Sequence, residues 1–358
     1  MPDKKKDITI LAVGDRADFD SYMKFNKERG SFREHGFDYA TVSYRRLLKR
    51  ELPKIANKKV IVVLFFPFSY WDEHIENGKY KGIYGNLVFC RKFIAFWKKA
   101  DSILRKGLKG KKVLFVNRPS VNGRYRDKMA VKNKLTHTSI HQPLLHRTSS
   151  VRYVRKLLDE GENLFLKPRC GSQGKGLTFL SRAKWMTNFI YQKNRIKNRH
   201  TDYGWVFRDI TDNERFLGQL LKEDILIEKG IKPLVLEGTM IDLRIYVFMG
   251  KVMFVYPRRN DPDNIVTNIS QGAWGDPSAL ALLPEHVIDR AKSTAEKAAK
   301  ALGLAICGID IMPADNLRDV YVIDINLFPG FPARKKFNLS RKIVEELSDL
   351  SGRGRLDF

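Results

Sequence analysis

The stretch Val320-Tyr-Val-Ile-Asp-Ile-Asn-Leu-Phe-Pro-Gly330 carries two polar residues, Asp324 and Asn326, inside an apolar run of the strand type. Because side chains alternate along an extended strand, both polar residues face one side and the isoleucines beside them face the other. A second strand-like run, Cys307-Gly-Ile-Asp-Ile311, places Asp310 fourteen residues before Asp324. Two carboxylates and an amide oxygen suit Mg²⁺, whose shell nucleotide phosphates and water commonly complete. We therefore predict a magnesium site at these three residues, with a solvated or turn-capping pair as the alternative for D-x-N alone.

A second pattern lies upstream of these strands. A predicted strand ends at Lys167, and a glycine-rich loop, Gly171-Ser-Gln-Gly-Lys-Gly176, leads into another strand. Glycines let a loop fold closely over phosphates and direct backbone N–H groups at them, while the lysine adds a positive charge. A P-loop or a dinucleotide fingerprint would continue into a helix instead. The pattern predicts a phosphate cradle between two strands, with an ordinary glycine-rich hairpin as the alternative.

The N-terminal part of the chain has the pattern of an open α/β domain, which we place at residues 1–118. Apolar runs predict buried parallel strands at Ile8–Val13, Val60–Phe66 and Lys112–Asn117, and a helix with one apolar face is expected over Leu87–Arg105. Beyond this domain, helices are predicted over residues 128–140 and 285–302, with glycine-punctuated strands between them. The fold class is therefore α/β with α+β character in its second part.

Composition and charge limit the classes of protein. The 358 residues are 43% hydrophobic, which is enough for two or three domain cores. The formal net charge of +26 favours polyanionic partners, and basic runs such as Lys193–Arg199 occur along the whole chain. No DNA- or RNA-binding module accompanies them. An acidic substrate, a nucleic acid and a merely solvated basic surface all remain open.

The cysteines and apolar runs bear on the compartment. The chain has three cysteines, Cys90, Cys170 and Cys307, and this odd, scattered set indicates neither a disulfide framework nor a zinc site. The apolar runs are far shorter than the roughly 20 residues of a membrane-spanning helix, and the charged N-terminus lacks a secretory pattern. We expect a cytoplasmic protein without a membrane span.

A third segment completes an ordered series of motifs. It contains a strand ending in Glu228, the D-x-R pattern of Asp242 and Arg244, an arginine pair beginning at Arg258, and the loop Ile265-Val-Thr-Asn-Ile-Ser-Gln-Gly272. Together with the lysine, glycine loop and acidic set, this order and spacing resemble the ATP-grasp superfamily. The likeness is to ribosomal-protein glutamate ligases, tubulin-tyrosine-ligase-like enzymes and especially spore-coat-associated ATP-grasp proteins, over roughly residues 126–332.

The resemblance implies a fold and a division of the chain. It implies an ATP-grasp domain at residues 119–358, preceded by the N-terminal open α/β domain. Within the ATP-grasp domain we expect a lid subdomain at about 150–230, a metal-binding subdomain at about 231–332 and a basic C-terminal helix.

The resemblance also implies roles for individual residues. Lys132 and Lys134 are rivals of Lys128 for the nucleotide, and Arg259 is a rival of Arg258. The family usually has Glu where this chain has Asp324, so one of two expected Mg²⁺ ions would be held less tightly. The implied catalytic residues are Arg258, Arg244 and Asn268, the metal ligands are Asp310, Asp324 and Asn326, and the nucleotide contacts are Lys128, Lys167, Gly171, Ser172, Gln173, Gly174, Gly176, Ile227, Glu228, Lys229 and Asp242.

The chemistry that follows is ATP- and Mg²⁺-dependent joining of a carboxylate to an amine through an acylphosphate, with Mn²⁺ as an alternative metal. Such a reaction relies on positioning and charge neutralisation and needs no protein nucleophile. The expected partners are small-molecule or peptide carboxylates and amines, including an acidic peptide tail. An ATP-grasp kinase that phosphorylates a hydroxyl and a basic polyanion-binding protein with a regulatory ATP site are the alternatives.

Overall fold

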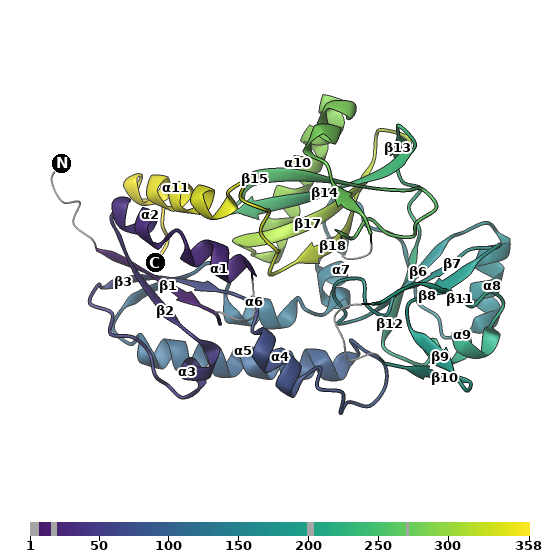
Figure 1. Cartoon of the computed structure of the whole chain (residues 1–358), viewed down its shortest axis with the longest axis horizontal. Helices are drawn as coiled ribbons and strands as arrows, with labels where there is room; N and C mark the ends of the chain where they lie inside the picture. Colours follow the sequence, from purple (N-terminus) through teal and green to yellow (C-terminus); the bar gives the residue numbers. More distant parts are fainter. Residues whose placement is uncertain (1–6, 16–19, 199–203, 270–271) are drawn as a thin grey trace.

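The structure is a computed structural model that describes residues 7–15, 20–198, 204–269 and 272–358. The described residues form three larger sheets and one two-stranded sheet, with flanking helices. Figure 1 shows the three larger sheets, which we call the N-terminal sheet, the lid sheet and the C-terminal sheet, arranged around a common centre. This arrangement confirms the predicted ATP-grasp fold with an N-terminal α/β domain. Among the described helices, none is long and apolar enough to cross a membrane.

The N-terminal sheet is parallel and has the order β2-β1-β3-β4. Its strands are β1 (Ile8–Val13), β2 (Phe37–Val42), β3 (Lys59–Leu64) and β4 (Lys112–Phe115). The helices of this part are α1 (Asp20–Asn26), α2 (Arg29–Glu34), α3 (Tyr44–Leu48), α4 (Phe68–His74) and α5 (Leu87–Gly107). The three predicted strands and the long helix are confirmed, but the prediction omitted β2, which lies at the sheet edge with half of its residues partly exposed.

The connecting segment and the lid follow in sequence. The connection contains α6 (Pro119–Arg124) and α7 (Lys128–Thr136), so the predicted helix ends four residues early. The lid sheet has the order β11-β8-β7-β6-β12-β5 and packs against two helices, α8 and α9. Its elements are β5 (Leu145–His146), α8 (Val151–Asp159), β6 (Leu164–Pro168), β7 (Thr178–Leu180), β8 (Trp185–Thr187), β11 (Arg208–Asp209), α9 (Glu214–Leu220) and β12 (Ile225–Lys229), with the hairpin β9 (Ile190–Gln192) and β10 (Arg195–Lys197) beside it.

The C-terminal sheet has the order β16-β15-β14-β17-β18, with β13 paired to β14. Helix α10 covers one face through a row of buried alanines, while α11 packs beside α1 and α2 of the N-terminal part. The elements are β13 (Val235–Leu236), β14 (Thr239–Phe248), β15 (Lys251–Asn260), β16 (Trp274–Gly275), the 3₁₀ helix η2 (Pro277–Leu282), α10 (Glu285–Leu302), β17 (Ile306–Pro313), β18 (Val320–Asn326) and α11 (Leu339–Gly352). The C-terminal helix was predicted to be basic, but α11 itself contains only two basic residues and three acidic ones.

One covalent link contradicts the prediction from the cysteines. Cys90 in α5 and Cys170, just after β6, form a disulfide with a Cα–Cα distance of 5.9 Å, although 80 residues separate them in sequence. Cys307 is free and buried. The spacing of the cysteines in the sequence could not predict this pair, because only the folded structure brings α5 against the end of β6. The cysteines therefore no longer support a cytoplasmic location.

Candidate active site

Two cavities meet between the three sheets. The larger has a volume of about 490 Å³ and is bounded by α4, α7, the glycine loop, β14, β15 and the segment after β18. The smaller, of about 290 Å³, lies between the lid sheet and the C-terminal sheet and includes the residues after β12. Lining residues that both cavities share mark their junction; they include Lys128, Glu228, Arg258, Asn268, Asp310 and Asp324.

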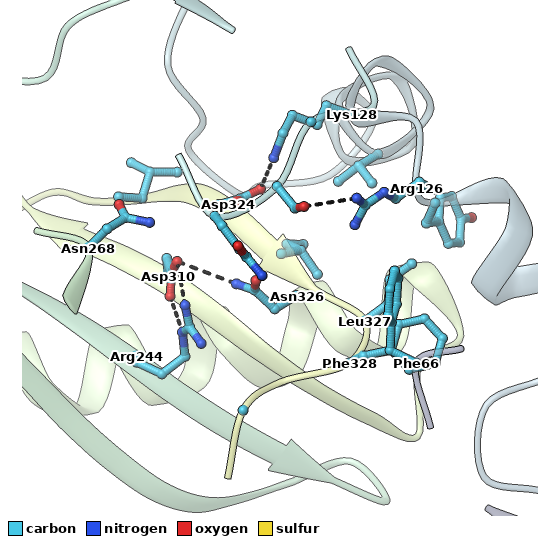
Figure 2. A pocket seen from close by; sticks show the side chains of 18 of the residues that line it. Phe66, Arg126, Lys128, Arg244, Asn268, Asp310, Asp324, Asn326, Leu327 and Phe328 are labelled. Carbon is cyan, nitrogen blue, oxygen red and sulfur yellow. Dashed lines mark hydrogen bonds and ion pairs between the residues drawn. The ribbon is translucent and has the colours of Figure 1, made fainter. Parts of the chain in front are cut away.

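The three predicted metal ligands come together at this junction (Figure 2). Strands β17 and β18 pair so that Asp310 lies opposite Asp324, and Asn326 Nδ2 donates to Asp310 Oδ2 at 3.4 Å. Among the described residues, no group of three or more His, Cys, Asp or Glu side chains could hold a metal. The set of two carboxylates and one amide is too small to complete the shell of a metal ion by itself. It suits an ion such as Mg²⁺ that takes its remaining oxygens from nucleotide phosphates and water.

Two arginines neutralise the buried aspartate of this set. Arg244 binds Asp310 through two N–H groups, and Arg258 Nη2 approaches Asp310 Oδ1 at 3.2 Å. Burial opposes ionisation of Asp310, but the two guanidinium groups outweigh it and hold the pKa of this carboxyl below its usual range. Both arginines line the larger cavity, where they are placed to face negative charge on a substrate.

Asp242 has a different place from the predicted one. It is fully buried beneath Arg258, which it binds through two hydrogen bonds, and it lies outside the described lining of both cavities. It therefore orients Arg258, and the predicted contact of Asp242 itself with a nucleotide is not supported by either cavity lining. The rival arginine, Arg259, points to the other side of the sheet, where it contacts Asp276 and Thr239.

Three lysines divide between two acidic partners. Lys128 Nζ lies 2.5 Å from Asp324 Oδ1, while Lys132 and Lys167 bind the two oxygens of Glu228 at 2.9 and 2.7 Å. Burial opposes the charge on Glu228, but the two lysines outweigh it and lower the pKa of this carboxyl. Burial lowers the pKa of Lys132 despite Glu228. Lys134, the third candidate of the sequence analysis, is exposed and outside both cavity linings.

The smaller cavity, which we call the slot, lies beside the end of β12. Glu228 and Lys229 line it together with apolar side chains from both sheets, including Phe165, Phe179 and Met312. Apolar walls with adjacent backbone polar groups suit a planar base. The side chain of Ile227 packs in the core beneath the lid and lies outside the described lining of the slot. The expected contact was through its backbone groups and stays a prediction.

The glycine loop is docked on the N-terminal part of the molecule. The disulfide at Cys170 fixes its start, Ser172 Oγ lies 3.2 Å from the Tyr84 hydroxyl, and the buried Lys175 binds Glu76 at 3.0 Å. Gly85 makes this approach possible: it has a φ of +69°, and a Cβ there would lie 2.7 Å from the backbone nitrogen of Gly171. Sequence patterns offered no sign of these contacts, which join segments far apart in the chain.

The remaining loop residues divide between the two cavities. Gly171 and Ser172 line both, Gln173 lines the larger and Gly174 the smaller. Gly176 lies outside both described linings; its φ is +70°, and a Cβ there would meet the rings of Phe189 and Pro168 at 2.7 Å. This glycine therefore serves packing beneath the loop.

The segment Arg126-Asp-Lys128 is fixed by the strand that precedes the loop. Asp127 accepts two hydrogen bonds of 2.7 Å from Arg169 and caps α7 through the Met129 N–H. Arg126 Nη2 donates to Ser172 Oγ at 2.9 Å, and its guanidinium lies 4.4 Å from the ring centre of Trp71. The resemblance of this Arg-Asp-Lys motif implied a role for Lys128 and none for Arg126 or Trp71.

A glycine loop between antiparallel strands, a slot at the end of a third strand, and an acidic pair on two further strands define an ATP-grasp protein. The chain belongs to the YheC/D-like ATP-grasp family, whose model matches residues 117–350.

The chain is also similar in sequence to proteins named as glutamate ligases. The chain is 27% identical over 217 residues to a probable alpha-L-glutamate ligase of Thioalkalivibrio sulfidiphilus, and 26% identical over 226 residues to one of Maridesulfovibrio salexigens. These matches cover 60% and 63% of this chain and span only 60% and 62% of the relatives' own length.

Solved structures resemble the chain over nearly its whole length. The ATP-grasp ligase PsnB, solved with a minimal precursor, Mg and ADP, matches with a TM-score of 0.56 and 15% identity over 94% of this chain and 96% of its own. A RiPP-associated ATP-grasp ligase of Chryseobacterium gregarium, solved with ADP and a leader and core peptide, gives 0.57 and 14%, covering 96% of each chain. The D-alanine–D-alanine ligase of Bacillus anthracis gives 0.55 and 15%, covering 97% and 98%. At these identities the likeness shows the fold.

Proposed function

We propose that the protein is an ATP-dependent carboxylate–amine ligase that forms an amide through an acylphosphate. The observation that carries this proposal is the meeting of two cavities at Asp310, Asp324 and Arg258. The slot beside β12 accommodates the nucleotide, and its phosphates extend along Lys167 and the glycine loop to this junction. The larger cavity approaches the junction from the other side and receives the carboxylate and the amine.

The reaction takes two steps in this arrangement. A carboxylate oxygen of the substrate attacks the γ-phosphorus, the bond to the β-phosphate oxygen breaks, and ADP leaves. The amine then attacks the acyl carbon, inorganic phosphate leaves, and the nitrogen loses a proton to phosphate or solvent. Arg258, oriented by Asp242, and Arg244 face the negative charge that moves during both steps, and Asn268 lies at the junction to bind the phosphoryl oxygens.

The metal fits the acidic set described above. Asp310, Asp324 and Asn326 would hold one or two Mg²⁺ ions, with Mn²⁺ as an alternative, and the bound metal supplies charge neutralisation at the phosphates. The solved complex of PsnB contains Mg and ADP, in agreement with this choice. Asp324 is shorter than the glutamate expected from the family, and its contact with Lys128 compensates part of its charge when the metal is absent.

The substrate class is also part of the proposal. Relatives named as glutamate ligases, and structural neighbours solved with peptides, support an amino acid or an acidic peptide as substrate. The net charge of +26 favours the same choice, because a basic surface attracts an anionic substrate. We place the reaction in the cytoplasm because it consumes ATP, even though disulfides such as Cys90–Cys170 are rare there.

An ADP-release screen tests the function. The full-length protein with ATP and Mg²⁺ is offered amino acids and acidic peptides, and products are identified by mass spectrometry. ADP together with a conjugate whose mass is the sum of both substrates minus water supports a ligase. A phosphorylated hydroxyl without conjugate would instead identify a kinase. Tight ATP binding without turnover on any substrate would identify the polyanion-binding alternative.

A further inference from the structure

Six cationic side chains line the larger cavity, and five of them have acidic partners there or directly behind it. Ion pairs join Lys128 to Asp324, Lys132 to Glu228, Lys175 to Glu76, Arg244 to Asp310, and Arg258 to Asp242 and Asp310. Arg126 is different: among the described residues, no carboxylate lies within 4.0 Å of its guanidinium. Glu76 and Asp324 act on this charge only from beyond direct contact, and burial lowers the pKa of Arg126 in spite of them. A half-buried charge without a direct ion pair is costly, so an anion is expected to approach it.

The surroundings of Arg126 fix the plane of the guanidinium. Its Cζ atom lies 4.4 Å from the ring centre of Trp71, 5.7 Å from that of Phe66 and 5.9 Å from that of Phe93. One nitrogen donates to the Ser172 hydroxyl at 2.9 Å, while Nε is buried with no partner. A planar fork held against aromatic rings suits bidentate binding of a carboxylate better than a flexible ammonium would.

The position of Arg126 distinguishes it from the phosphate-binding groups. Lys128, Ser172 and Arg258 line both cavities and so border the junction, whereas Arg126 and Arg244 line only the larger cavity. Arg244 is bound to Asp310 at the junction, but Arg126 has no carboxylate of the described residues in direct contact. In Figure 2 it lies on the side of Asp324 and Asn326 away from Asn268. The carboxylate that reacts belongs at the junction, so Arg126 meets a different group.

We propose that Arg126 recognises a second carboxylate of the substrate, so that the larger cavity takes a unit with at least two carboxylates, as in glutamate or an acidic peptide. This rests on the proposed function for the direction in which the cavity is used. Arg126 acts as a specificity-determining residue: it holds the unit by its non-reacting carboxylate while the other carboxylate, or the amine of the same unit, lies near Arg258.

Binding measured by calorimetry tests the proposal without turnover. The protein is saturated with Mg²⁺ and a non-hydrolysable ATP analogue, and two matched pairs of probes are compared. L-Glutamate against L-glutamine represents a free amino acid. A C-terminally amidated triglutamate peptide against the same amidated peptide with glutamine in its first two positions, which leaves a single carboxylate, represents an acidic peptide. In each pair only the additional carboxylates differ, and the pair that shows a preference identifies the source.

Three variants complete the design. Arg126→Gln removes the charge, Arg126→Lys keeps the charge but loses the fork, and Arg124→Gln is the matched control, because Arg124 is exposed at the end of α6 two residues away. We expect the acidic probe of one pair to bind about tenfold or more tightly in the wild type. Arg126→Gln should abolish this preference, Arg126→Lys should keep part of it, and Arg124→Gln should keep all of it. Circular dichroism and a thermal melt show whether each variant is folded, and unchanged affinity for the ATP analogue shows that its nucleotide site is intact.

Several results would overturn the proposal. They are equal binding of both members in each pair, no binding of any probe at millimolar concentration, or a preference that survives in Arg126→Gln. A loss of ATP-analogue affinity in a folded Arg126→Gln would make Arg126 a phosphate ligand. If Arg126→Gln does not fold, the Arg126→Lys variant decides. An unchanged preference of Arg126→Lys for the acidic probe would show that the planar guanidinium is not needed for binding the second carboxylate. The ADP screen is independent of these outcomes, so failure of the ligase function and failure of this inference can be told apart.

Discussion

Asp310 and Asp324 lie directly opposite each other on β17 and β18, yet each binds cations from a different part of the chain. Arg244 and Arg258 of the C-terminal sheet bind Asp310, whereas Lys128 at the start of α7 binds Asp324. The acidic pair is therefore the point at which the connecting segment and the C-terminal sheet are held together across the active site.

Asp310→Asn and Asp324→Asn should each lower turnover about 100-fold or more, because each loses a carboxylate where the phosphoryl group is transferred. ADP release measured against Mg²⁺ concentration checks this expectation, and excess Mg²⁺ should restore part of the activity. Asp315→Asn is the control, since that side chain pairs with the exposed Lys232 away from both cavities. Near-wild-type rates for both site variants at sub-millimolar Mg²⁺ would place the metal elsewhere.

Lys167→Ala should abolish ATP binding while the protein stays folded, because it removes the charge at the end of β6 that faces the phosphates. Lys156→Ala, on the exposed side of α8, is the matched control. Calorimetry with ATP and Mg²⁺ measures the effect. Unchanged affinity in folded Lys167→Ala would show that the phosphates bind elsewhere.

Glu228→Gln should reduce the free energy of unfolding by about 3 kcal/mol or more at pH 7, because it leaves Lys132 and Lys167 buried without their partner. The pKa of Glu228 is lowered in the folded protein, so its stabilisation is fully present above the usual glutamate pKa of about 4.3 and is lost as pH falls through the lower folded value. Urea unfolding of both proteins from pH 7 to pH 3 measures this. A difference between them that stays constant over the whole range would contradict the ion-pair explanation.

The number of cysteine thiols that react with a labelling reagent should differ between the native, the denatured and the reduced denatured protein. Without reductant the native protein should remain unlabelled, because Cys90 and Cys170 are bonded and burial raises the pKa of Cys307 to about 12. Denaturation without reductant should expose one thiol, and denaturation with reductant three. Reduction should also speed hydrogen exchange at residues 171–176, since the start of the glycine loop is released. Two additional thiols in the unreduced denatured protein would show that the disulfide does not form in solution.

Ionic strength should raise the KM for an acidic substrate more than it changes the affinity for ATP. Surface charges are screened over about 10 Å at 0.1 M salt and about 3 Å at 1 M, whereas Lys132 and Lys167 beside the proposed nucleotide site are largely buried and less screened. Reversing Lys193, Arg195 and Lys197 in the β9–β10 hairpin should reproduce the effect at low salt; Arg199 of the same run lies outside the described residues. A KM that is flat across this salt range would assign the basic surface to another partner.

The sequence placed Asp324 and Asn326 on one strand as the structure has them, because strand alternation fixes which residues share a face; their role as metal ligands stays a prediction. Asp324 and Asn326 needed only that periodicity, and the extent of α10 followed from its apolar pattern. Strand β2 escaped prediction because an edge strand exposes one side and lacks a continuous apolar run. Its sequence also follows a short helix directly, which weakens the boundary signal.

The contacts between side chains that are distant in the sequence could not be predicted in the same way. Asp242 lies on the strand expected to face the site, but only the structure shows that Arg258 covers it. The contacts of Trp71 with Arg126 and of Cys90 with Cys170 join segments between which no sequence pattern runs. Long-range pairs of this kind depend on the packing of domains, which local periodicity does not encode.

The engagement of both metal-binding aspartates by cations has a consequence for the order of events in catalysis. In the free protein Asp310 and Asp324 are already compensated, and the described residues offer no third acid to favour a lone divalent ion. A metal that arrives alone must compete with Arg244, Arg258 and Lys128, but one that arrives with ATP brings its own phosphate oxygens. Under the proposed function, the ion would therefore enter as the counter-ion of the nucleotide, and the metal and ATP would load as a single complex.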